Sequence, residues 1–163
     1  MSTENATLTD DSLDLIIDTL LNASLLLIAV SAQAMAQFDD AITVPQFQAL
    51  MILAKQGPIN LATLASLLGV QPSATGRMVD RLVSAGLIDR LPHPTSRREL
   101  LAALTPRGRD IVGKANEYRR AEFAKILKKM PPAERDGLVR GLAAFTAAGG
   151  EPPAVTYLEN MDA

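Results

Sequence analysis

Apolar residues recur at helical spacing over most of this chain. Leu, Ile, Val, Ala and Met return three and four positions apart, which is the pattern of a helix that buries one face. The pattern predicts helices over residues 11–38, 44–56, 61–68, 72–85, 106–130 and 132–148. Short strands are expected over 87–91 and 99–104, where the second stretch alternates with a period of two. The predicted fold class is therefore mainly α (α+β).

Local signals mark where the central helices begin and end. Asn60 is a suitable N-cap for 61–68, and Gly69 stands where a helix-ending glycine is favoured. Pro72 opens the next helix after a very short turn, and Thr105-Pro106 opens the long one. A helix, a tight turn, a second helix and a hairpin together predict a winged helix-turn-helix core, flanked by long N- and C-terminal helices.

The N-terminal helix is apolar nearly all round. Residues 20–36 carry no charge, so a membrane span must be weighed against a helix buried by partners on several sides. Asp14 and Asp18 lie just upstream, and the flanks are acidic rather than basic. We therefore expect a buried helix that forms an oligomer, and no membrane.

The helix over 72–85 has a polar face that folding does not require. Small residues near its start suit entry into a DNA groove, and Gly76 costs about 1 kcal/mol relative to Ala in a helix interior. Arg77 and Arg81 suit guanine edges or phosphates, although an arginine on a polar face is often only solvated. The expected DNA contacts of this recognition helix are Gln71, Ser73, Ala74, Thr75, Arg77 and Arg81.

The loop over 92–98 contains two prolines and two arginines. Its expected DNA contacts, to a narrow minor groove or to flanking phosphates, are Thr95, Ser96, Arg97 and Arg98. Arg90 is expected to brace the hairpin through an acid such as Asp80 or Asp89. His93 is interpreted as a solvated loop residue, and a minor-groove contact is the alternative.

The net charge of −2 conceals a strong segregation. Residues 1–56 carry seven acids and one base, whereas residues 71–109 carry seven arginines and three acids. A cationic middle segment is the local footprint of a nucleic-acid binder.

The chain has no cysteine and one histidine, so thiol chemistry, zinc-thiolate sites and clustered-histidine metal sites are excluded. No constellation for nucleophilic or metal-assisted catalysis is visible. We therefore expect no cofactor, no metal and no enzyme, although a hydrolase using carboxylates alone stays open. The absence of cysteine also favours a cytoplasmic location.

Three short stretches within 44–108 resemble the winged-helix core of the MarR family of bacterial transcriptional regulators. They are Ser84-Ala85-Gly86-Leu87-Ile88, the pair Arg97-Arg98 and Leu104-Thr105-Pro106-Arg107-Gly108, and the weaker resemblance extends over 11–148. The resemblance implies a homodimer, clasped by its end helices, that binds a pseudopalindromic operator in the bacterial nucleoid. It also implies a small, often aromatic or phenolic, effector bound between the dimerisation helices and the DNA lobe.

The wing departs from the family pattern at one place. The family arginines correspond to Arg77 and Arg97, but Ser96 stands where an Asp usually precedes the arginine pair, and His93 stands where another acid is frequent. The carboxylate of the ion pair that normally orients the wing is therefore missing at this position. The wing is expected to be either looser or held by its prolines.

These observations divide the chain into five segments. We expect a disordered start over residues 1–10, dimerisation segments over 11–43 and 109–148, a DNA-binding domain over 44–108 and a flexible tail over 149–163. The expected function is a homodimeric transcriptional regulator, a repressor relieved by an organic effector. The alternative is a winged-helix module that binds protein, through its apolar N-terminal helix, rather than DNA.

Overall fold

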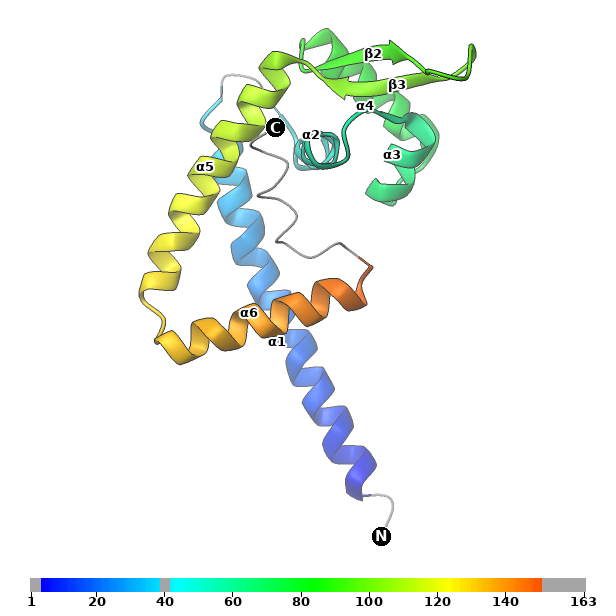
Figure 1. The fold of residues 1–163 in the computed structure, drawn as a ribbon. Coiled ribbons are helices and arrows are strands. Elements are labelled where there is room, and N and C mark those ends of the chain that lie inside the picture. Colours follow the sequence, from blue (N-terminus) through cyan, green and yellow to red (C-terminus); the bar gives the residue numbers. More distant parts are fainter. Residues whose placement is uncertain (1–3, 39–41, 151–163) are drawn as a thin grey trace.

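A computed structural model describes residues 4–38 and 42–150, and Figure 1 shows its arrangement as a winged-helix lobe from which long helices extend. The predicted link over 39–43 and tail over 149–163 lie largely outside these residues. The described elements are α1 (Glu4–Met35), α2 (Val44–Gln56), β1 (Ile59–Asn60), α3 (Leu61–Leu68), α4 (Pro72–Ser84), β2 (Ile88–Pro92), β3 (Leu100–Leu104), α5 (Pro106–Lys128) and α6 (Pro132–Ala148).

The lobe from α2 to β3 is built around one apolar core. The largest fully buried aliphatic side chains come from four elements and the turn before β2, and they are Leu50, Leu64, Val79, Leu82, Leu87 and Ile88. The sheet is antiparallel in the order β1-β3-β2. The sequence predicted β2 and β3 but not β1, because a two-residue strand shows no alternation.

The predicted helix caps are confirmed. The side chain of Asn60 accepts from the Thr63 amide at 2.8 Å, and the Thr105 hydroxyl accepts from the Gly108 amide at 2.9 Å. Gly69 ends α3 with a φ of 67°, a left-handed conformation that glycine adopts without steric cost. Caps of this kind stabilise a helix by about 1 kcal/mol each, so the lobe's helix boundaries are specified locally.

The turn that follows α4 is hydrogen-bonded to the start of α5. The Thr105 hydroxyl donates to the Gly86 carbonyl at 2.7 Å, and Arg107 Nη1 donates to the Ala85 carbonyl at 2.8 Å. Gly108 is packed against this turn so closely that a Cβ there would lie 2.2 Å from the Leu87 carbonyl oxygen. We call this contact between residues 85–87 and 105–108 the turn clasp.

α1 begins at Glu4, so the expectation of a disordered start was wrong for residues 4–10. That stretch contains no glycine or proline, and extending an existing helix adds one hydrogen bond for each residue fixed. α1 packs on α5 and α2 near its C-terminal end, where Val30, Ala34 and Met35 are buried.

The rest of α1 extends away from the lobe (Figure 1) and leaves most of its apolar surface exposed. The most apolar 18-residue stretch within Ser12–Met35 has a mean hydropathy of 2.0, so by length and composition this is the one described helix that could cross a membrane. α6, whose residues are all described, has no buried residue. The exposed apolar residues of these two helices include Leu15, Ile16, Leu21, Leu25, Ile28, Val139, Leu142 and Phe145.

Replacing Gly108 by Ala is expected to lower the free energy of unfolding by about 1–3 kcal/mol or more, because the new methyl group overlaps a backbone carbonyl. Gly113→Ala in the same helix is the matched control, since its Cβ would meet nothing within 4 Å. The control should stabilise by up to about 1 kcal/mol. Urea unfolding of both variants measures the difference, and equal effects would show that the close approach does not matter.

Candidate nucleic-acid interface

The two faces of α4 differ sharply in burial. Thr75, Val79 and Leu82 point into the core, while the opposite face exposes mostly polar side chains. This face is the predicted one, and its exposed members are Ser73, Arg77, Asp80, Arg81 and Ser84. A methyl group added to Gly76 would meet nothing within 4 Å, so internal packing does not require a glycine there.

Thr75 does not belong to the exposed face, and the expectation that it contacts DNA was wrong. Its side chain is fully buried, and its hydroxyl donates to the Gln71 carbonyl one turn earlier at 3.3 Å. Thr75 lies four residues before Val79, so the helical period places both on the inner face. The other predicted contacts of this helix stay accessible, with Gln71 exposed and Ala74 half-buried.

Arg77 and Arg81 line a shallow cleft of about 350 Å³ beside the start of α2. The other wall contains Thr43, Pro45 and Gln46, which form the N-terminal turn of that helix. A helix N-terminus carries a partial positive charge, so it adds to the potential of the two arginines. Sequence alone does not place this turn in the site, because only the fold brings it next to α4.

The wing consists of β2, β3 and the loop between them. Thr95, Arg97 and Arg98 are exposed and Ser96 is half-buried, so three of the four predicted wing contacts are exposed to solvent. Figure 1 shows the hairpin tip projecting from the lobe.

The arginines of the lobe fall into two groups. Arg90 forms an ion pair with Asp80 and thereby joins β2 to the polar face of α4, as predicted. Within the described part of the chain, the side chains of Arg77, Arg81, Arg97 and Arg98 form neither a hydrogen bond nor an ion pair. Since nothing in the lobe neutralises these four charges, they are available to an anionic partner.

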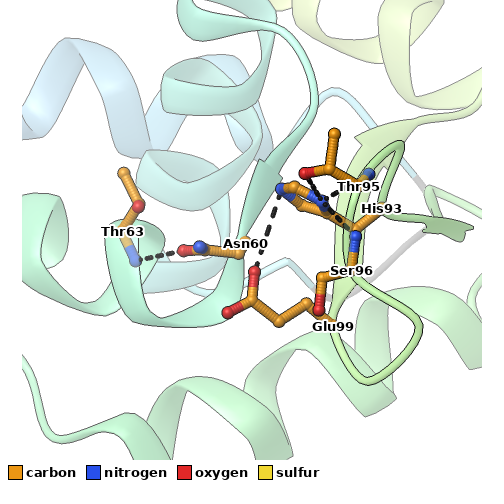
Figure 2. Close-up of polar contacts among 6 residues, drawn as sticks. All are labelled: Asn60, Thr63, His93, Thr95, Ser96 and Glu99. Atoms are coloured by element: carbon orange, nitrogen blue, oxygen red, sulfur yellow. Dashed lines mark hydrogen bonds and ion pairs between the residues drawn. The ribbon is translucent and has the colours of Figure 1, made fainter.

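His93 is held in the loop rather than solvated, which corrects its interpretation from sequence. Its Nδ1 lies 3.2 Å from the backbone amide nitrogens of both Thr95 and Ser96 (Figure 2). Its Nε2 lies 3.8 Å from Glu99 Oε2, and 26% of the side chain is exposed. The loop therefore has a polar anchor in addition to its two prolines.

A helix-turn-helix with unpaired arginines on its second helix, followed by an arginine-tipped hairpin, defines the winged-helix class of DNA-binding proteins. Comparison with known families matches residues 42–100 to the MarR family. The chain belongs to this family, whose members are DNA-binding transcriptional regulators rather than enzymes.

Individual relatives agree with this assignment. The HTH-type transcriptional regulator Mb0904 of Mycobacterium bovis is 30% identical over 69% of this chain and 78% of that protein. The multiple antibiotic resistance protein MarR of Salmonella typhimurium is 38% identical over 54% of this chain and 61% of that protein. The crystal structure of RV1404 from Mycobacterium tuberculosis is similar with a TM-score of 0.80 and 70% identity, covering 88% of this chain and 97% of that one.

Thr75→Val is expected to leave DNA affinity unchanged within about twofold, because the side chain faces the core and the replacement has nearly the same shape. The melting temperature should move only slightly, since the lost hydrogen bond is long. Fluorescence anisotropy with a labelled duplex measures the affinity. A large loss of binding by a normally folded variant would show that Thr75 does take part in DNA binding.

Proposed function

We propose that two copies of this chain form a repressor that binds a pseudopalindromic operator in the bacterial cytoplasm and that a small organic molecule releases it. The observation that carries the DNA-binding part is the set of four unpaired arginines on α4 and the wing loop. In this proposal residues 44–108 bind DNA, and residues 11–43 and 109–148 form the dimer.

The recognition helix enters the major groove in this proposal. Ser73, Ala74 and Gly76 give its first turns a low profile, so that backbone can approach the bases closely. Arg77 and Arg81 then reach guanine edges or phosphates, and the N-terminal turn of α2 adds a positive potential beside them. Arg97 and Arg98 contact the neighbouring minor groove or its phosphates from the wing.

A second copy of the chain is the partner proposed for α1 and α6. These helices expose a row of large apolar side chains that the lobe of the same chain does not cover. Two acids, Asp14 and Asp18, interrupt the N-terminal part of α1, which suits a helix packed among protein helices better than one surrounded by lipid. A twofold axis would then set the two recognition helices about 34–36 Å apart, one turn of DNA.

The proposed effector binds where the long helices meet the lobe. Ala34, Met35, Phe47 and Ala115 form a small core at this junction, and Phe38, Ile42 and Met51 pack against both this core and the main core of the lobe. The Arg119 guanidinium lies 5.8 Å from the Phe47 ring centroid and 6.0 Å from that of Phe123. In this proposal the effector is an aromatic molecule with an anionic group that binds near Arg119, and it weakens DNA binding by its preference for one lobe separation.

The alternative function, binding of protein rather than DNA, is favoured by the exposed apolar surface of α1. Selection of bound duplexes from a random pool distinguishes the two functions. The repressor proposal predicts an inverted repeat with half-sites about one helical turn apart. If no sequence is recovered and the protein is not retained on heparin at low salt, the result would support the protein-binding function instead.

Arg77→Ala is expected to weaken binding to the selected operator by about 1–3 kcal/mol and to relax specificity at one base pair in each half-site. Lys129→Ala removes the same charge at the far end of α5 and should change affinity much less. Binding isotherms at several salt concentrations measure both effects. Equal losses would mean that Arg77 contributes only general charge.

Leu25→Glu is expected to weaken the dimer more than tenfold, because burial of one leucine side chain contributes about 1.5–3 kcal/mol and the change occurs in both copies. Leu25 is 67% exposed in one chain. Leu67→Glu on α3, where Leu67 is 50% exposed, provides a control outside the proposed interface. Sedimentation equilibrium measures the dimer, and the same dissociation constant for both variants would exclude this surface of α1.

A further inference from the structure

The wing loop contains an interaction that neither the DNA contacts nor the core requires. Two consecutive backbone amides, those of Thr95 and Ser96, converge on a single acceptor, His93 Nδ1, at 3.2 Å each (Figure 2). The Thr95 hydroxyl lies 3.3 Å from the same atom. The next residue along the chain is Arg97, whose side chain is exposed and unpaired among the described residues.

We propose that His93 is the positioning residue of the wing: its imidazole holds the 95–96 turn and thereby sets the direction of Arg97 toward DNA. The proposal rests on the proposed function, because it assigns His93 a role in DNA binding through Arg97. His93 itself need not contact DNA, since its ring is largely covered by the loop.

His93 contacts the opposite side of the loop through both its backbone and its ring. The His93 amide donates to the Glu99 carbonyl at 3.3 Å, which continues the pairing of the hairpin past β2 and β3. On the edge of the ring opposite Nδ1, the Nε2 atom lies 3.8 Å from a carboxylate oxygen of Glu99. The imidazole therefore spans from one strand end to the turn, and a displacement of the turn would break contacts at the ring.

This geometry fixes the proton of the ring. Nδ1 can accept from backbone amides only while it carries no proton, so the hydrogen of the neutral ring is on Nε2, toward Glu99. A proton on Nδ1 would face two N–H donors and remove the only acceptor that the ring offers them. The arrangement thus requires one particular tautomer, which is a measurable property.

Pro92 and Pro94, on either side of His93, do not replace the hydrogen bonds that His93 accepts. Pro92 and Pro94 fix their own φ angles and lack amide donors, but they do not hold the amides of Thr95 and Ser96. With the turn already fixed in the free protein, Arg97 loses less conformational freedom when it binds. Ser96 carries no charge and cannot form the ion pair that usually orients the wing in this family. His93 orders the wing in its place.

The chain offers a matched pair of substitutions to test this. The side-chain amide of Asn places an acceptor near the position of Nδ1, whereas that of Gln places one near Nε2. His93→Gln should weaken binding to the selected operator roughly tenfold, the scale of losing one or two neutral hydrogen bonds. His93→Asn should bind within about twofold of the wild type.

Combination with Arg97→Ala tests whether His93 acts through that arginine. Once Arg97 is absent, adding His93→Gln should weaken binding by less than about twofold, because there is no guanidinium left to position. Equal losses for Asn and Gln, or a full additional loss in the Arg97→Ala background, would overturn the proposal. Thermal melting of each variant checks that the lobe is folded.

The tautomer can be measured without DNA. Because His93 is the one histidine of the chain, the two-bond ¹H–¹⁵N spectrum of histidine-labelled full-length protein reports on this ring alone. We expect the neutral ring to be the Nε2–H tautomer, and an Nδ1–H tautomer would overturn the proposal. If the wild type bound no duplex while this tautomer was observed, the DNA-binding function would fail and the hydrogen bonding of the turn would stand.

Discussion

The turn clasp connects the part of the molecule that is proposed to bind DNA to the part that is proposed to form the dimer. Thr105 and Arg107 bind the carbonyls of Gly86 and Ala85, while Gly108 lets the two backbones touch. α5 continues from this contact and packs along α1. α4 therefore ends on the same short segment from which α5 begins, and this segment links the position of one helix to that of the other.

The electrostatics of the protein are local rather than global. The chain as a whole is slightly acidic, yet the lobe presents four arginines with no internal partner among the described residues, on α4 and the wing. Arg90 and Arg107 serve the fold instead, through Asp80 and the Ala85 carbonyl. The difference between the two groups is not one of residue type. It depends on whether the fold brings an acceptor within reach.

Much of the fold could be predicted from sequence because its signals are local. The N-caps at Asn60 and Thr105 and the polar face around Arg77 require only spacing within one element. What sequence missed depends on contacts between segments or on small shifts around a helix. β1 exists only through its pairing with β3, and Thr75 faces the core although Ser73 and Arg77, two positions away on either side, are exposed.

His93 illustrates the same limit within the site, since its role depends on the amides of a loop whose path spacing does not reveal. The proposed function as a whole depends on two chains presenting two recognition helices to one duplex. Sedimentation velocity of the full-length protein with a labelled duplex carrying one selected inverted repeat tests this most directly. We expect a complex of two chains per duplex at saturation, and a saturated complex with one chain, or no complex at low salt, would contradict the proposed function.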